Sequence, residues 1–107
     1  MARTKASKDD TFKDFVLDQL DGLEGLRGRA MFGGFGLYSG EAFFAIVFKS
    51  RLYFKTRAGT RDRYIERGMK PFRPSAKQSL TSYYEVPLEI IEDAVQLTAW
   101  ARAAARV

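Results

Sequence analysis

The residues best suited to chemistry are the basic side chains in the middle of the sequence. Between Lys49 and Arg73 there are nine Lys and Arg against two acidic residues, a net charge of +7, whereas the rest of the chain carries −2. Arginine forms paired hydrogen bonds with phosphate and carboxylate groups, and aromatic side chains among such charges are typical of nucleic-acid surfaces. Tyr53, Tyr64 and Phe72 lie within this segment. The candidate nucleic-acid or partner residues are Arg51, Arg57, Arg61, Arg63 and Arg67.

The same segment also has an ordinary structural interpretation. Glu66 lies three or four residues from Arg63 and Lys70, a spacing that favours ion pairs along a helix. Exposed arginines commonly serve solubility alone. We expect Arg57, Arg61 and Arg63 to be exposed, and both interpretations stay open at this point. The net charge of +5 is compatible with an acidic partner and does not require one.

The glycines of Gly33-Gly34-Phe35-Gly36 invite comparison with a phosphate loop. Such loops need a Lys and a Ser or Thr at the start of a helix, and dinucleotide sites need a third glycine three residues on. Neither pattern is present, because Leu37 and Tyr38 follow and position 39 is Ser. We therefore expect these glycines to let a strand bend or another segment approach its backbone.

The acidic residues offer little support for catalysis. Four aspartates share one face of the first expected helix, where they either bind a hard cation or form a solvated surface, and the second interpretation is the commoner one. They are Asp10, Asp14, Asp18 and Asp21. The chain has no His and no Cys, so the usual acid–base group, thiol nucleophile and metal ligands are missing. We expect no catalytic residue, no metal and no cofactor.

The spacing of apolar residues predicts the elements that position these side chains. Phe12, Phe15, Val16 and Leu20 share a face of a first helix that ends before Gly22, and Tyr64 and Ile65 point inward from a second. Strands are expected at residues 29–38, 43–48, 51–55 and 80–86, with a tight turn at Lys49-Ser50, and residues 69–74 form an edge strand because they contain two prolines.

A last helix is expected to begin at Pro87, and its apolar residues lie in one stripe along it. The stripe consists of Ile91, Ala94, Val95, Thr98 and Ala101. The order helix, three strands, helix, two strands, helix predicts a two-layer α+β domain with an antiparallel sheet of about five strands. We expect one domain over residues 9–107 after a disordered tail of residues 1–8. No apolar run approaches the roughly 18 residues of a membrane helix and no signal peptide is recognisable, so we expect a cytoplasmic protein.

Five short motifs follow one another in a specific order. They are Arg29-x-Met31-Phe32-Gly33-Gly34-x-Gly36-Leu37-Tyr38, Leu52-Tyr53-x-Lys55, Gly68-Met69-x-Pro71-Phe72, Ser82-Tyr83-Tyr84-Glu85-Val86-Pro87, and Asp93 with Trp100-Ala101-Arg102. Together they resemble the TfoX (Sxy) N-terminal domain family over about residues 10–106. The resemblance implies a two-layer α+β fold similar to that of secretion chaperones.

The resemblance also implies a function. The founding members of the family are bacterial regulators of natural competence that act with the catabolite-regulator protein and carry a second, C-terminal domain. Because this sequence stops at Val107, we expect a stand-alone member. We expect a non-enzymatic regulatory module that binds a transcription-related protein partner, with direct, non-specific nucleic-acid binding as the alternative. Most of the aromatic residues should belong to the core. Tyr38, Tyr53, Tyr83 and Tyr84 could instead form an exposed strip that suits a partner or a homodimer, although Tyr83 and Tyr84 must face opposite sides of a strand.

Overall fold

A computed structural model describes residues 8–31, 33–75 and 77–107 of the chain. The expected tail of residues 1–8 lies outside this part except for Lys8, where the first helix begins. The helices are α1 (Lys8–Gln19), α2 (Ala58–Glu66), α3 (Leu88–Ile91) and α4 (Ala94–Ala105). The strands are β1 (Leu26–Met31), β2 (Gly34–Ser39), β3 (Ala42–Phe48), β4 (Arg51–Lys55), β5 (Pro71–Ser75) and β6 (Gln78–Glu85).

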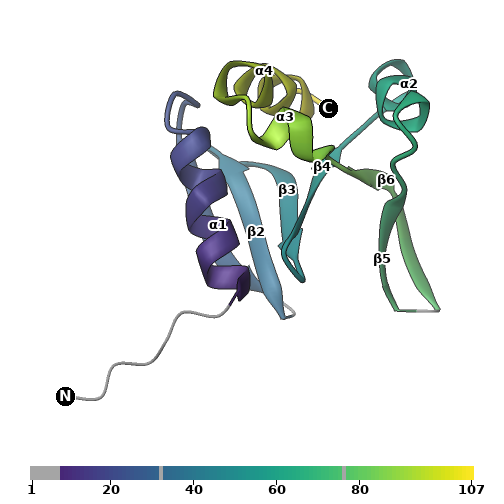
Figure 1. Ribbon diagram of the computed structural model, residues 1–107, viewed down its shortest axis with the longest axis horizontal. Helices are drawn as coiled ribbons and strands as arrows, with labels where there is room; N and C mark the ends of the chain where they lie inside the picture. The colour runs from purple at the N-terminus through teal and green to yellow at the C-terminus, as the bar shows by residue number, and fades with distance from the viewer. Residues whose placement is uncertain (1–7, 32, 76) are drawn as a thin grey trace.

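The strands form one antiparallel sheet in the order β1-β2-β3-β4-β6-β5, which confirms the α+β prediction (Figure 1). The sheet has six strands where about five were expected, because residues 29–38 fold as a hairpin and not as one strand. Met31 pairs with Gly34, and Gly33 between them has a φ of +83°. Glycine adopts this left-handed conformation readily, so the chain reverses where the sequence pattern predicted only a bend.

The expected tight turn at Lys49-Ser50 is present and joins β3 to β4. Phe48 pairs with Arg51 across it, and Lys49 and Ser50 have φ values of +51° and +59°. Positive φ at both central residues is the geometry that suits the twist of a two-residue hairpin. It is adopted here without the Asn or Gly that usually supplies it.

The helices of the described residues cover one face of the sheet. α1, α3 and α4 lie over the central strands (Figure 1), and the main core joins their buried side chains to those of the strands. A bulge in β3 enlarges this core, because Leu37 pairs with Ala45 and Tyr38 pairs with Phe43. Phe44 is the extra residue, and Phe44 and Ala45 are both fully buried.

The opposite face, which we call the outer face, carries a second apolar cluster made only of strand residues among those described. Its buried members are Ile46, Tyr53, Phe72 and Tyr83, and Phe43 and Phe48 pack against them. Phe72 lies 4.8 Å from Tyr53 and 5.4 Å from Phe48, measured between ring centroids. Strands β3, β4, β5 and β6 all contribute, so this cluster fastens the β5–β6 hairpin to the middle of the sheet.

The C-terminal segment differs from the single helix expected after Pro87. It divides into α3 and α4 because Asp93 adopts an extended conformation and accepts a hydrogen bond from the backbone N–H of Gln96, which starts a new helix. The break changes which residues face inward: Val95 is 81% exposed, and the buried residues of α4 are Leu97, Trp100, Ala101 and Ala104.

Two other apolar residues expected to face inward are also exposed. Phe15 on α1 and Ile65 on α2 are 44% and 51% exposed, whereas their neighbours Val16 and Tyr64 are buried. The buried stripe on each of these helices is therefore narrower than the sequence pattern predicted. Residues 69–74 do form an edge strand, β5, as expected from their prolines.

Substitution of Gly34 tests the close packing of β2 against β3. An added Cβ there would collide with the carbonyl oxygen of Val47 and would lie 3.2 Å from the ring of Phe48. We therefore expect Gly34→Ala to destabilise the protein by at least about 2 kcal/mol, which lowers Tm by roughly 8 °C or more. Thermal unfolding followed by circular dichroism measures this change.

Gly22→Ala is the matched control, because a Cβ at Gly22 meets nothing within 4 Å. Its stability should stay within about 0.5 kcal/mol of the parent. Equal Tm values for the two variants would show that β2 and β3 do not approach each other as described.

Candidate functional site

The arginine-rich helix α2 is attached to the rest of the protein through Tyr64. This side chain is 1% exposed, and its ring lies 4.9 Å from Trp100 on α4 in an edge-on arrangement and 6.2 Å from Tyr84 on β6. Burial raises the pKa of the Tyr64 hydroxyl far above its ordinary value. Tyr64 is thus a neutral anchor that connects α2 to both the helical layer and the sheet.

Two of the predicted arginines complete this anchor. The guanidinium carbons of Arg63 and Arg67 lie 4.3 and 5.2 Å from the centre of the Trp100 ring system, distances typical of cation–π contacts. The Nε of Arg67 also lies 3.9 Å from a carboxylate oxygen of Glu89 on α3. We call Arg63, Tyr64, Arg67 and Trp100 the Trp100 cluster.

Because Arg63 packs against Trp100, part of its guanidinium group is not accessible to a ligand. Its Nε is buried and has no hydrogen-bond partner among the residues that the structure describes, which is unfavourable for a polar group. The side chain is half-buried, so the expectation that Arg63 is exposed was wrong. The sequence could not show this contact, because Trp100 lies 37 residues further along the chain.

The two arginines at the start of α2 differ from each other. The Nε of Arg61 donates a hydrogen bond of 3.1 Å to the hydroxyl of Thr56, which in turn donates to the carbonyl oxygen of Ser82. Arg61 is therefore half-buried and tied to β6, contrary to expectation. Arg57 is exposed as expected, and its backbone N–H donates to the hydroxyl of Thr60.

Arg51 lies apart from the other four. Its Nη1 donates to both carboxylate oxygens of Glu85 at 3.1 and 3.2 Å, across the β4–β6 pair. It stands at the start of β4, roughly 13 Å of strand before the end from which the chain continues into α2. The structure thus gathers four of the predicted arginines on α2 and at its two capping positions, Arg57 and Arg67, and places Arg51 beside the β3–β4 turn.

The four tyrosines considered for an exposed strip do not form one, and the alternative that most aromatic residues are core holds for two of them. Tyr83 and Tyr84 do face opposite sides of β6, because Tyr83 belongs to the outer-face cluster and Tyr84 packs against the main core. Tyr53 and Tyr83 are nevertheless buried, with 9% and 7% exposure, and burial raises the pKa of both hydroxyls. Only Tyr38 and Tyr84 are half-exposed.

The glycine-rich stretch and the aspartate row take structural positions. Gly34 and Gly36 lie inside β2, where an added Cβ at Gly36 would come within 2.9 Å of Met31 and of the Phe43 ring. This confirms that the glycines permit close approach within the sheet. On α1, Asp14 and Asp18 are exposed, and Asp14 pairs with Lys13 at 3.1 Å. The part of the chain that is described contains no group of three carboxylates placed to hold a metal ion.

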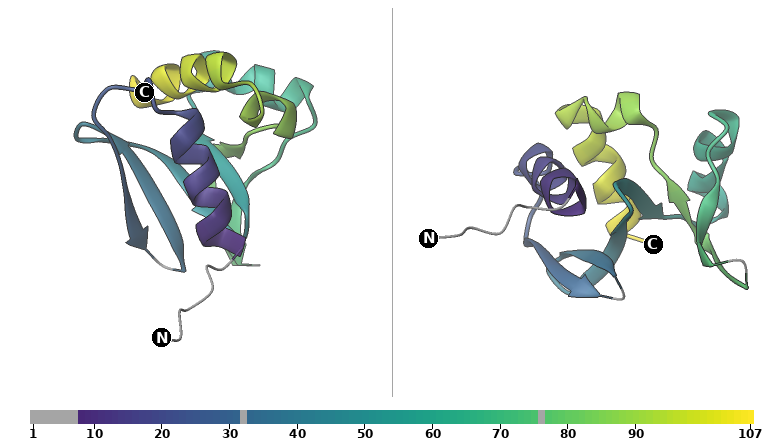
Figure 2. Two further views of the ribbon diagram at one scale, coloured as in Figure 1. Left: turned by 60° about the vertical axis from the view of Figure 1, so that its left-hand side comes forward. Right: turned by 60° about the horizontal axis from the view of Figure 1, so that its bottom comes forward.

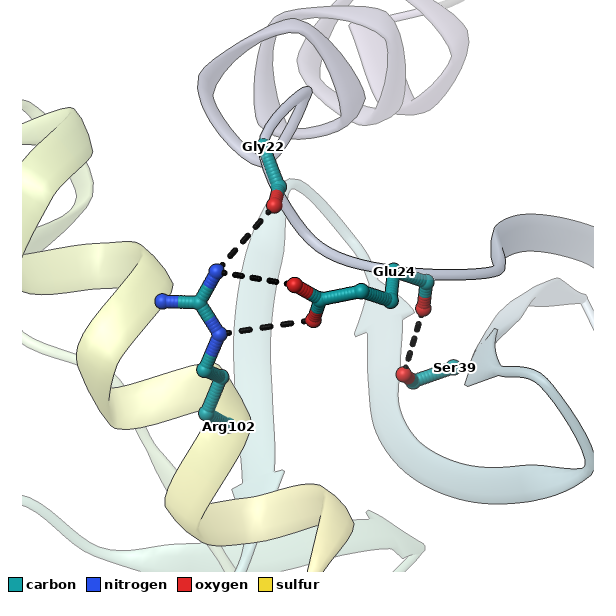
Figure 3. Close-up of polar contacts among 4 residues, drawn as sticks. All are labelled: Gly22, Glu24, Ser39 and Arg102. Carbon is teal, nitrogen blue, oxygen red and sulfur yellow. Dashed lines mark hydrogen bonds and ion pairs between the residues drawn. The ribbon is translucent and has the colours of Figure 1, made fainter.

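A polar junction holds the loop after α1 between the sheet and α4 (Figure 3). Arg102 donates to both carboxylate oxygens of Glu24, at 3.4 and 3.2 Å, and to the carbonyl oxygen of Gly22. The hydroxyl of Ser39 donates to the carbonyl oxygen of Glu24 at 2.6 Å. These contacts hold the loop that leads into β1, so they act on the fold at the edge of the sheet.

The architecture defines the class of protein: a two-layer α+β module with an arginine-rich helix fixed to its C-terminal helix. The TfoX N-terminal domain family matches residues 18–107, and the chain belongs to this family. A comparison with curated proteins found no match. None of the helices in the described ranges has the length and apolar character needed to span a bilayer.

The Glu24–Arg102 pair predicts a pH dependence of stability. The hydrogen bonds from Arg102, together with its positive charge, lower the pKa of the Glu24 carboxyl below its ordinary value of 4.5. The contribution of the pair is therefore present above pH 4.5 and is lost as the pH falls through the lowered value.

We expect Glu24→Gln to have a lower Tm than the parent at pH 7 and the difference to shrink as the solution is acidified below pH 4.5. Glu41→Gln, another exposed carboxylate in a nearby turn, is the control and should change Tm little. A Glu24→Gln difference that stays constant down to pH 2.5 or so would contradict the role of the ionised pair.

Proposed function

We propose that this protein is a non-enzymatic regulatory module of the TfoX type that acts in the cytoplasm by binding a transcription-related protein partner. The observation that carries the proposal is the family match over residues 18–107. The geometry adds a candidate contact region on α2. There the exposed Arg57 and the outer edge of the Trp100 cluster are presented on a helix whose position is fixed by Tyr64.

This region has the properties of a contact surface for an acidic partner. The arginines that pack on Trp100 lose little side-chain freedom on binding, since they are already held in place. Arginine is also enriched at protein interfaces, where it combines charge with flat packing surfaces. The proposal therefore assigns α2 a rigid, positively charged recognition face.

Affinity capture from a bacterial lysate, with the tagged full chain as bait, tests the proposal. We expect enrichment of a transcription regulator or an RNA polymerase subunit, and weaker enrichment with Arg57→Glu because this substitution reverses the charge of an exposed residue on α2. Lys77→Glu, which changes an exposed lysine in the β5–β6 turn, is the matched control. Recovery of no transcription protein, or equal loss in both variants, would count against the proposal.

A second candidate function is direct, non-specific binding of nucleic acid. The observation that favours it is the net charge of +7 on residues 49–73, which includes the exposed Arg57, Lys70 and Arg73. If these residues and their neighbours neutralise about four phosphates, a plot of log affinity against log salt concentration should have a slope of about −3.6.

The structure indicates which variants test this candidate cleanly. Arg61 and Arg63 support the position of α2, so replacing them would confuse folding with binding. The triple variant Arg57→Ala, Lys70→Ala and Arg73→Ala changes exposed residues only and should make the slope less negative by about 2 to 3. Arg29→Ala, an exposed arginine outside the segment, should leave the slope unchanged. Binding that does not respond to salt would eliminate this candidate.

A further inference from the structure

Strand β1 is an open edge of the sheet. It is the first strand in the order β1-β2-β3-β4-β6-β5 and, within the described residues, pairs with β2 alone. Its four central residues, Arg27 to Ala30, are all exposed. In the left view of Figure 2, β1 is the outermost strand, with β2 beside it on its inner side. A row of backbone hydrogen-bonding groups is therefore available for a further strand.

The register shows which backbone groups point outward. Met31 pairs with Gly34 across a two-residue connection, and β1 and β2 stay in register without a bulge from there to Leu26. In an antiparallel ladder, residues alternate between those that bond to the neighbouring strand and those that face away from it. The pair that closes a two-residue hairpin is of the first kind. Gly28 and Ala30 therefore direct their N–H and C=O groups to the open side.

The other edge of the sheet is closed to such pairing. β5 contains Pro71 and Pro74, which have no N–H to donate, and its register with β6 shifts twice. Prolines and irregular register are the usual means by which an edge avoids unwanted strands. β1 contains no proline and pairs with β2 in regular register, so it lacks the features that protect the β5 edge.

The charge on β1 favours an acidic neighbour over a basic one. Arg27 and Arg29 pair with Tyr38 and Gly36, on the face of the sheet opposite the core residue Leu37, and β1 has no acidic residue. Arg27 is held in place, because its guanidinium donates to the carbonyl oxygen of Gly40 and lies 5.1 Å from the centre of the Tyr38 ring. Two-fold pairing of β1 with a second copy, centred on Gly28, would set Arg27 of each copy opposite Arg29 of the other, and like charges directly opposite are destabilising.

We infer that β1 binds an extended acidic segment of another protein as an added strand. Backbone groups of Gly28 and Ala30 supply the hydrogen bonds, and Arg27 and Arg29 select carboxylates on one face of the incoming strand. The arginines also disfavour basic strands and, in the register centred on Gly28, a second copy of this chain, so the same residues supply attraction and discrimination. The site goes beyond the proposed function, because it lies on a different edge of the sheet from β5 and involves no residue of α2.

Amide hydrogen exchange of the full chain, followed by NMR, tests the inference with a defined probe. The probe is a synthetic eight-residue peptide in which Glu alternates with Val, and the matched control is the peptide in which Lys replaces Glu. At about ten times the Kd of the acidic peptide, exchange of the Gly28 and Ala30 amides should slow by about tenfold. Protection confined to other strands, or equal binding of both peptides, would overturn the inference.

Two sets of variants separate strand addition from simple charge attraction. Ala30→Pro removes an outward N–H at an edge position and should abolish binding of the acidic peptide, while Ala30→Val keeps the N–H and should bind as the parent does. The double variant Arg27→Glu and Arg29→Glu keeps the backbone and should reverse the preference toward the Lys peptide. It tests the inference even if Ala30→Pro fails to fold. Dimerisation of the parent through β1, seen by analytical ultracentrifugation together with protection of the same amides, would contradict the choice of partner.

Discussion

The structure depends on the close approach of side chains to glycine backbone on the outer face of the sheet. A sheet with helices on one side only must protect its other side by different means. Here Gly34 and Gly36 leave room for the rings of Phe48 and Phe43 and for Met31 to lie directly against β2. Those rings lead on to the cluster of Ile46, Tyr53, Phe72 and Tyr83, which draws β5 and β6 toward the central strands. The glycine-rich motif thus allows the side chains on the outer face, which no helix of the described residues covers, to pack into a second apolar cluster.

Much of this arrangement was predictable from local patterns in the sequence, and the exceptions have physical causes. Hydrophobic spacing located α1 and α2, the β3–β4 hairpin and the proline-blocked edge strand. It missed the β1–β2 hairpin, because Gly33 reverses the chain through a positive φ that a pattern of apolar residues does not encode. It also missed the break between α3 and α4, because the apolar pattern after Pro87 does not mark Asp93 as the cap of a new helix. Helix-favouring sequence continues on both sides of that break, so only the cap marks it.

The candidate arginines show a different limit of sequence reasoning. Composition identified the basic segment, but the environment of each arginine depends on residues far away in the chain. Trp100 holds Arg63 and Arg67, Glu85 holds Arg51, and Thr56 holds Arg61 only because β6 holds Thr56. A count of charges does not distinguish between these environments. The structure separates the exposed Arg57 from arginines that also contribute to packing.

The region around α2 and the β1 edge therefore differ in which groups are held in place. Around α2 the arginines lie on an aromatic support, and their positions are set before any partner arrives; cation–π contacts of this kind contribute about 0.5 to 2 kcal/mol each. Along β1 the side chains are exposed and the backbone is the ordered element, fixed by regular pairing with β2. The ordered groups are therefore side chains at α2 and main-chain hydrogen-bonding groups at β1. Because Arg102 and Glu24 join α4 to the loop that leads into β1, while Tyr64 joins α2 to α4, one continuous set of contacts connects both regions. That continuity keeps α2 and β1 at fixed positions relative to each other.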